Sequence, residues 1–395
     1  MIVFSAHRLY TPSEEILQPL LFAEDGLISA VSTRAEQEIP GNATVIDLGC
    51  EFRDAILAPG FVDVHMHGGA GVDVMRASPG ELPRLNRFLA THGVTGYFPT
   101  TVAAPLDETC TALQRMAEAI ESAQTSHNSG DNVQAQPLGI HLEGPFLSHK
   151  RRGVHPPENL VEPTLDIFDR LWQAARGYVR VMTIAPELPG ALEVITEAAR
   201  RNVCVSIGHS DAVMEQARAG VKAGARHATH TFNAMRPLDH REPGILGEAL
   251  TNDELTADII VDGIHVAPEM VKLFLQAKGI DRAVLITDAT AAAGMPDGDY
   301  QLGPIQVQVK DGRCTLRGET DGQLAGSVLT MDRAVRNVTR FASWSLQDAV
   351  RSASINPARV AGLAQHGQLT PGAQANFVVL SPDGEVRRTI VRGLV

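Results

Sequence analysis

Histidine, glutamate and aspartate stand at the ends of short apolar runs in the middle of this chain. The first run, residues 55–64, leads directly into His65-Met66-His67, whose two imidazoles lie on the same side of an extended strand. Further runs end in single residues of the same kinds, namely Glu143, His209, His230 and Asp288. Because imidazole and carboxylate groups bind divalent transition metals, the pattern predicts a metal site.

The chemistry that these residue types favour is metal-assisted hydrolysis. Imidazole and carboxylate together suit Zn²⁺ or Fe²⁺, and Mn²⁺ and Co²⁺ accept them too. An incomplete ligand set leaves a position for water, whose pKa a metal lowers toward neutrality. Asp288 follows the last apolar run and is suited to take a proton from that water and return it to a leaving nitrogen. The predicted reaction is cleavage of a carbonyl–nitrogen or carbonyl–oxygen bond.

Strands that alternate with helices are expected to position these residues. Apolar runs predict strands over residues 56–66, 94–102, 138–143, 179–185, 203–208, 227–232, 256–261 and 283–287. Helical patterns occupy residues 81–92, 106–123, 188–201, 212–223, 268–278 and 329–341. The fold class is therefore α/β, with a (β/α)8 TIM-type barrel, in which catalytic groups lie at the carboxyl ends of the strands.

The two ends of the chain have a different pattern from its middle. Short strands and turns fill residues 1–55, with Asp25-Gly26 as a hairpin signal, and residues 367–395 are similar. We expect these two segments to form one small β-sandwich domain beside a metal-dependent barrel over residues 56–366. The polar stretch 122–136 is expected to be a loop.

Composition excludes several classes of protein. The chain has 395 residues, 44% of them hydrophobic, and a net charge of -12, so we expect a large core and no nucleic-acid partner. Its four cysteines form no disulfide or Cys-x-x-Cys pattern. No apolar stretch approaches the roughly 20 residues that span a bilayer, and the N-terminus lacks a secretory apolar core. We expect a cytoplasmic protein with no membrane partner.

Isolated polar residues usually have a structural role. We expect His92, His127 and His366 to be packed or hydrogen-bonded histidines. Arg151 and Arg152 would ordinarily be solvated surface charges. The metal-type residues differ from these cases because they recur at successive strand ends, which a purely structural role does not explain.

Seven motifs stand in order along nearly the whole chain. They are Asp-Val-His-Met-His at 63–67, His-Leu-Glu-Gly-Pro-Phe at 141–146, Gly-His-Ser at 208–210, Thr-His-Thr-Phe-Asn-Ala-Met at 229–235, Arg-Glu-Pro-Gly at 241–244, Asp-Gly-Ile-His at 262–265 and Thr-Asp-Ala at 287–289. Together they resemble the N-acetylglucosamine-6-phosphate deacetylase family of the amidohydrolase superfamily. His-Leu-Glu-Gly-Pro and Asn-Ala-Met followed by Arg-Glu-Pro-Gly are much more specific to that family than His-x-His.

The resemblance implies a role for each metal-type residue. Glu143, His209 and His230 match the common metal ligands of the family. His65 and His67 match a pair that completes a second metal site in those members that retain it, so one or two ions are implied. Asp288, which also counts among the ligands, matches the catalytic acid and base.

The resemblance also implies substrate contacts and a homodimer. Arg241 matches a phosphate-binding arginine that reaches across the dimer interface into the neighbouring active site. The other implied contacts are Val154, His155, Asn233, Ala234, His265, Leu324, Ala325 and Gly326. The implied partner is a phosphorylated amino sugar.

The implied reaction is deacetylation of N-acetylglucosamine 6-phosphate to glucosamine 6-phosphate and acetate by metal-bound hydroxide. A histidine such as His155 or His265 is expected to help stabilise the oxyanion. One alternative is the galacto epimer, which differs at a single hydroxyl. Another is a catalytically silent sugar-phosphate-binding protein, although all six metal-type residues are intact. Cyclic-amide hydrolases that bridge two metals with a carboxylated lysine are disfavoured, because the predicted fourth strand, 179–185, lacks lysine.

Overall fold

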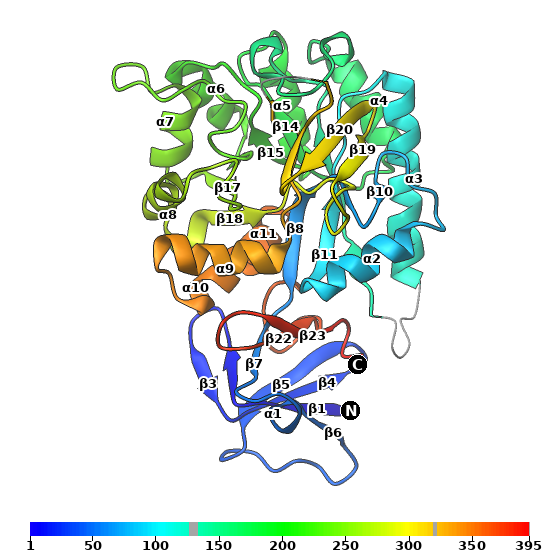
Figure 1. Cartoon of the computed structure of the whole chain (residues 1–395), viewed down its shortest axis with the longest axis vertical. Helices are drawn as coiled ribbons and strands as arrows, with labels where there is room; N and C mark the ends of the chain where they lie inside the picture. The colour runs from blue at the N-terminus through cyan, green and yellow to red at the C-terminus, as the bar shows by residue number, and fades with distance from the viewer. Residues whose placement is uncertain (126–132, 319–321, 395) are drawn as a thin grey trace.

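The computed structural model describes residues 1–125, 133–318 and 322–394, which form a β-rich part and a larger α/β part (Figure 1). The α/β fold class expected from the sequence is confirmed. His127 and part of the predicted loop 122–136 lie outside the described residues. Within the described ranges, no helix is long and apolar enough to cross a membrane.

The β-rich part brings the two ends of the chain together. Its first sheet has the order β5-β4-β1-β6, with β1 Ile2–Ser5, β4 Pro19–Glu24, β5 Leu27–Thr33 and β6 Thr44–Asp47. Its second sheet has the order β23-β22-β7-β2-β3, with β2 Arg8–Tyr10, β3 Glu15–Leu17, β7 Ile56–Pro59, β22 Phe377–Leu380 and β23 Val386–Ile390. Phe4 and Phe377 join the sheets edge to face, with ring centroids 4.9 Å apart.

The predicted strand over residues 56–66 is two strands in the structure. β7 pairs with β2 and β22 in the β-rich part, whereas β8 (Phe61–Met66) pairs with β11 (Val94–Pro99) in the α/β part. Gly60 separates them at a place where any side chain would collide with Thr95, because an added Cβ would lie 2.3 Å from its methyl carbon. The division into domains at residues 55 and 367 stays a prediction.

Parallel strands in two arcs form the centre of the α/β part. One arc is β12-β11-β8, where β12 is Gln136–Pro137. The other is β13-β14-β15-β16-β17-β18, comprising Ile140–Glu143, Val179–Ile184, Cys204–Ile207, His227–Ala228, Thr256–Ile260 and Ala283–Ile286. Backbone hydrogen bonds connect the arcs at both sides, from Thr101 to the His141 carbonyl (3.0 Å) and from Asp288 to the His65 carbonyl (2.9 Å). This closure brings the strand ends near one another.

Helices follow the strands around this centre (Figure 1). The six predicted helices are present as α2 Leu82–Thr91, α3 Leu106–Thr125, α5 Ala191–Arg200, α6 Met214–Ala223, α8 Pro268–Arg282 and α9 Met331–Ala342. Further helices were not predicted: α1 Leu48–Glu51, α4 Leu165–Ala174, α7 Gly244–Thr251, α10 Leu346–Ala353 and α11 Ile355–Val360. α4 had a readable start, since the Thr164 hydroxyl accepts the Ile167 amide as an N-cap.

A small antiparallel sheet after β18 was also not predicted. It consists of β19 Gly298–Leu302, β20 Ile305–Lys310 and β21 Arg313–Leu316. β20 alternates buried and exposed residues, and its inward residues, such as Val307, pack in a separate cluster with Val102 and Ala325. The insertion therefore lies over one side of the strand ends.

Candidate metal centre

The six metal-type residues all lie at or just beyond the carboxyl ends of parallel strands. Glu143 ends β13, while His65 and His67 stand at the end of β8. His209, His230 and Asp288 each lie two residues beyond a strand, with positive φ angles of 45°, 29° and 49°. Non-glycine residues rarely adopt such backbone angles, and when they do they are frequently found at functional sites. All six side chains are buried.

Three of these residues, Glu143, His209 and His230, point nitrogen and oxygen atoms that can bind metal at one another. His209 Nδ1 lies 2.8 Å from the Arg151 carbonyl and His230 Nδ1 lies 3.2 Å from the Asn233 carbonyl, so each Nδ1 carries a proton that it donates. In the neutral rings both Nε2 atoms then hold lone pairs, yet they lie 3.1 Å apart. Glu143 Oε1 lies 3.2 Å from one and 3.1 Å from the other. Such a group needs a proton or a cation between its members.

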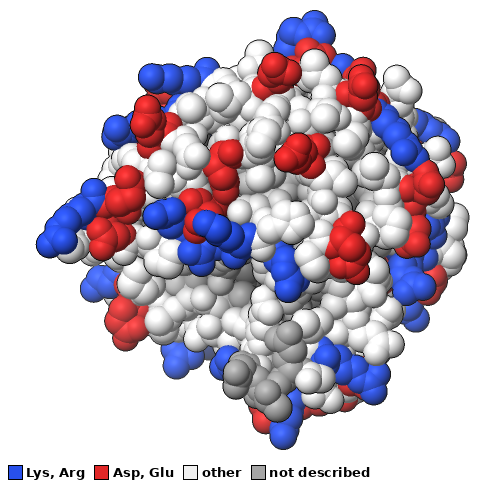
Figure 2. All heavy atoms as spheres, turned by 90° about the horizontal axis from the view of Figure 1, so that it is seen from above, with Lys and Arg blue, Asp and Glu red and all other residues white. Residues whose placement is uncertain are grey.

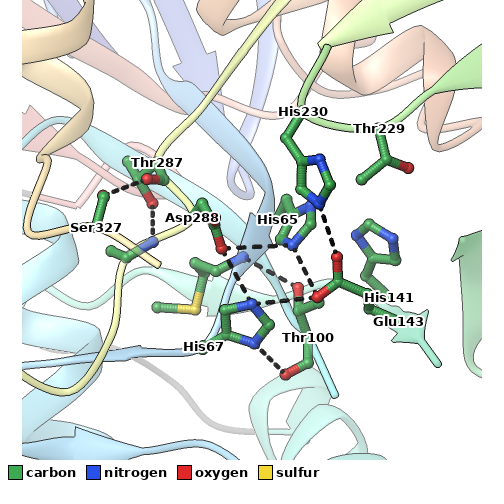
Figure 3. A network of polar contacts seen from close by, with 12 residues as sticks. His65, His67, Thr100, His141, Glu143, Thr229, His230, Thr287, Asp288 and Ser327 are labelled. Atoms are coloured by element: carbon green, nitrogen blue, oxygen red, sulfur yellow. Dashed lines mark hydrogen bonds and ion pairs between the residues drawn. The ribbon is translucent and has the colours of Figure 1, made fainter. Parts of the chain in front are cut away.

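A second group adjoins the first through the other oxygen of Glu143 (Figure 3). His67 donates from Nδ1 to the Thr100 carbonyl at 3.1 Å, and its Nε2 lies 3.1 Å from Asp288 Oδ1 and 3.4 Å from Glu143 Oε2. His65 Nε2 lies 3.4 Å from Glu143 Oε2 and 3.6 Å from Asp288 Oδ1. Neither buried ring nitrogen of His65 has a hydrogen-bond partner among the described residues.

These donor atoms fit a divalent metal. Imidazoles and carboxylates converge in a buried place, and the His65 nitrogens have no hydrogen-bond partner among the described residues. The ligand atoms of His65, His67 and Glu143 lie within 4.8 Å of one another. The structure thus contains a His and Glu cluster able to bind metal, next to Asp288.

Protons substitute for the cation when no metal is bound. Burial disfavours charge on all these groups, yet contacts with Asp288 and Glu143 raise the pKa of His67 to about 10. Likewise, Glu143 outweighs burial and raises the pKa of His230 to about 9. The histidines in turn hold the pKa of Asp288 at about 2 and that of Glu143 well below its ordinary value, against the effect of burial. Metal binding therefore displaces protons from this cluster.

His155 also faces the cluster, but a hydrogen bond from the Ala103 amide gives its ring a different role from that of the metal-type histidines. Its Nδ1 accepts the Ala103 backbone amide at 3.1 Å, so the proton of the neutral ring is on Nε2. Nε2 lies 3.7 Å from Glu143 Oε2. Burial, followed by the charge of His209, lowers the pKa of His155 to about 3, so the ring stays neutral. A neutral ring with Nε2–H is a hydrogen-bond donor and not a metal ligand.

Asp63 supports the strand end that carries Asp288 and was missed among the functional candidates. It is fully buried, and its Oδ2 accepts the Thr287 hydroxyl at 2.6 Å while its Oδ1 accepts the amides of Thr287 and His65 at 3.3 Å. Burial raises its pKa to about 6, although these hydrogen bonds oppose the rise. The network links β8 to Thr287, the residue before Asp288. A carboxylate inside an otherwise apolar strand was the signal in the sequence.

A cavity of about 370 Å³ opens onto the cluster. Most of the expected substrate contacts line it, namely Val154, His155, Asn233, Ala234, His265, Leu324 and Gly326. Ala325 is instead buried in the apolar cluster of the insertion. Arg241 is exposed and lies outside the lining of this single chain. Lys150 and Arg151 also line the cavity, although no such role was expected for them.

Other histidines have the structural roles expected of them. His92 Nδ1 lies 3.0 Å from Asp332 Oδ1. His366 is buried, and burial followed by the charge of Arg392 lowers its pKa to about 4. Arg152 donates to the His155 carbonyl at 2.9 Å and so supports the loop that carries the cavity lining.

Comparisons with known proteins agree with this arrangement. Residues 56–395 match the amidohydrolase family. The chain is 38% identical to an N-acetylgalactosamine-6-phosphate deacetylase of Escherichia coli O157:H7, with 99% of this chain and 98% of the relative covered. It is 37% identical to an N-acetylglucosamine-6-phosphate deacetylase of Bacillus subtilis (strain 168), with 98% and 94% covered.

A solved structure is similar over the whole chain. It is a variant of N-acetyl-D-glucosamine-6-phosphate deacetylase from Mycobacterium smegmatis in complex with N-acetyl-D-glucosamine-6-phosphate. The TM-score is 0.89 at 34% sequence identity, and the match covers 100% of this chain and 98% of that one.

Proposed function

Because the chain belongs to the amidohydrolase family, we propose that it removes the acetyl group from N-acetylglucosamine 6-phosphate, giving glucosamine 6-phosphate and acetate. The observation that carries this proposal is the convergence of Glu143, His209 and His230 beside Asp288 at the base of a cavity. Relatives that act on this substrate are similar along nearly the whole chain.

The proposed cofactor is one or two divalent ions. Glu143, His209 and His230 would hold one ion, and His65 and His67, with Glu143 or Asp288, would hold a second. Zn²⁺ or Fe²⁺ suits this mixture of nitrogen and oxygen donors best, and Mn²⁺ or Co²⁺ also fits. When bound, such an ion polarises a carbonyl and lowers the pKa of water.

The residues of the chain carry the proton transfers. Asp288 is ionised, with its pKa at about 2, so it can accept a proton from the attacking water. The same carboxyl then delivers that proton to the sugar nitrogen as the carbon–nitrogen bond breaks. His155 donates from Nε2–H to the acetyl oxygen as that oxygen gains charge. His265, whose Nδ1 lies 2.7 Å from Asp262 Oδ2, is held at the cavity wall for contact with the sugar.

The proposed assembly is a homodimer in the cytoplasm. Arg241 lies in the exposed segment before α7 and outside the lining of its own cavity. We infer that it reaches the site of the neighbouring subunit and binds the 6-phosphate there. A dimer with two-fold symmetry would complete both sites at once.

Acetate release tests the proposed function directly. Metal-loaded protein is given N-acetylglucosamine 6-phosphate, its galacto epimer and unphosphorylated N-acetylglucosamine in parallel. Preference for the first supports the proposal, whereas preference for the second supports the other deacetylase found among the relatives. No turnover of any of them, with metal bound, would favour a silent sugar-phosphate-binding protein.

A further inference from the structure

The rim of the cavity carries two positive charges that the reaction steps do not use. Lys150 and Arg151 are the only lysine and arginine among the described residues that line it. Both belong to the 3-10 helix η1 (His149–Arg151), with side-chain exposures of 79% and 32%. On the face opposite the β-rich part, Lys and Arg side chains stand beside a hollow (Figure 2).

One carboxylate orients this basic pair without neutralising it. Arg151 Nε donates to Asp211 Oδ1 at 2.9 Å, and Lys150 Nζ lies 3.4 Å from Asp211 Oδ2. Arg236 approaches the same carboxylate at 3.5 Å. Glu187 lies nearby, where it accepts the Asp211 amide at 2.6 Å. Three cations therefore lie around Asp211, with Glu187 beside it, so this group of five side chains has a net positive charge.

Arg151 retains donors for a further partner. Its contact with Asp211 uses Nε, and the two terminal guanidinium nitrogens have no partner among the described residues. A guanidinium held at Nε is pre-oriented, so it loses little freedom when its remaining donors bind an anion. The match of these paired donors to phosphate oxygens is well known for arginine.

The basic pair is tied to the metal centre through the backbone. The Arg151 carbonyl accepts His209 Nδ1 at 2.8 Å, and the Ser148 amide donates to the His209 carbonyl at 2.9 Å. Residues 148–151, which include the two cations, are therefore hydrogen-bonded to His209. A hexosamine whose acetamide lies over the cluster would extend its far end toward the rim of the cavity.

We propose that Lys150 and Arg151 bind the 6-phosphate of the substrate from within the same subunit. This inference rests on the proposed function and adds a phosphate contact that is independent of Arg241. The phosphate carries a charge between about -1.5 and -2 at neutral pH, so it needs more than one cation. Recognition of the phosphate would then survive, in part, when the neighbouring subunit contributes no arginine.

The experiment compares phosphorylated and unphosphorylated substrate in full-length, metal-loaded protein. The variants are Lys150→Gln, Arg151→Gln and the double variant, and the matched control is Lys272→Gln, an exposed lysine on α8 away from the cavity. In the double variant, kcat/KM for N-acetylglucosamine 6-phosphate should fall by roughly tenfold to a hundredfold, mainly through KM. The value for N-acetylglucosamine should stay within about twofold of wild type.

A binding measurement provides a second readout. Measured by calorimetry, the double variant should bind glucosamine 6-phosphate more weakly than wild type does. Its affinity for glucosamine should equal that of wild type. Equal losses on both substrates, or no loss in any variant, would overturn the inference. Lys150→Gln should fold normally, because the Lys150 side chain is largely exposed, so a loss of phosphate binding in this variant is not due to misfolding. Failure of wild type to release acetate would reject the proposed function itself, a result distinct from either of these.

Discussion

The Nε2 atoms of His209 and His230 lie 3.1 Å apart, while backbone carbonyls accept the protons of both Nδ1 atoms. Two lone pairs at this distance repel each other unless a cation or a proton lies between them. The backbone has therefore set both tautomers in the form that binds metal before any metal arrives. Glu143 completes the group with one oxygen and uses its other oxygen toward the His65 and His67 pair.

Replacement of one of these histidines should remove the metal. In His230→Gln we expect metal content per chain to fall below that of wild type and acetate release to fall by about a thousandfold or more. Elemental analysis after gel filtration measures the first effect. His92→Gln is the control, since that ring pairs with Asp332 away from the cluster. Retention of full metal content by His230→Gln would contradict the assignment.

Asp288→Asn should separate proton transfer from metal binding. The amide has nearly the same shape but cannot accept the proton, so kcat should fall by about a hundredfold to ten-thousandfold. The pair of histidines and Glu143 remain, and at least one ion should stay bound. Steady-state kinetics with metal analysis on the same sample checks both. Wild-type kcat in this variant would exclude Asp288 as the acid and base.

Gly153→Ala should disturb the metal centre without replacing any of the proposed ligands. Gly153 has a φ of +57°, and a Cβ there would lie 3.1 Å from His209 Cε1. Gly312→Ala is a matched control, because its φ is +75° but nothing lies within 4 Å of the new methyl group. Both should lose about 1 kcal/mol of stability through the backbone. Only Gly153→Ala should also weaken metal binding, measured by competition with a chelator.

Lys278 should make the free energy of unfolding depend on pH in the alkaline range. Burial, with the charge of Arg282, lowers its pKa to about 8, and Nζ donates to the Ala249 and Asn252 carbonyls. The unfolded chain keeps this proton up to the ordinary pKa of about 10.4, so between the two values it binds more protons than the native state. This group therefore raises the unfolding free energy with pH across that window, by at most about 1.4 kcal/mol per unit.

The comparison of Lys278→Met with wild type tests this contribution. The melting temperature of wild type relative to the variant should increase between about pH 8 and pH 10. Lys272→Met changes an exposed lysine of the same helix and should show no such trend. A difference that is constant over this range would show that Lys278 keeps its proton in the folded chain.

Mixed subunits test the proposed reach of Arg241 across a dimer. Arg241→Gln and Asp288→Asn should each be weak in N-acetylglucosamine 6-phosphate turnover. If both variants are unfolded and refolded together, each heterodimer has one complete site. That site combines the intact Asp288 of one subunit with the intact Arg241 of the other. Activity should recover to roughly a quarter of the wild-type value. No recovery in a mixture that contains heterodimers would mean that Arg241 acts within its own subunit.

Much of the architecture was readable from local patterns. The apolar runs at 179–185 and 283–287 correspond to β14 and β18, because strands covered on both faces are continuously apolar. The helices missed include α7, which is buried along nearly its whole length and so lacks an amphipathic stripe. The β19–β21 insertion was missed because its alternating pattern follows β18, after which only a helix was expected.

The sequence by itself determined which residue types meet at the strand ends, because every metal-type residue lies at the end of a strand or within two residues of it. Only the tertiary structure decided which ring nitrogen of each histidine carries the proton. The proton of His209 is positioned by a carbonyl 58 residues away, and that of His155 by an amide 52 residues away. The Lys150 and Arg151 side chains look like ordinary surface charges until folding places them on the cavity rim. These partners lie in loops that are distant in the sequence, so no local residue spacing predicts the contacts.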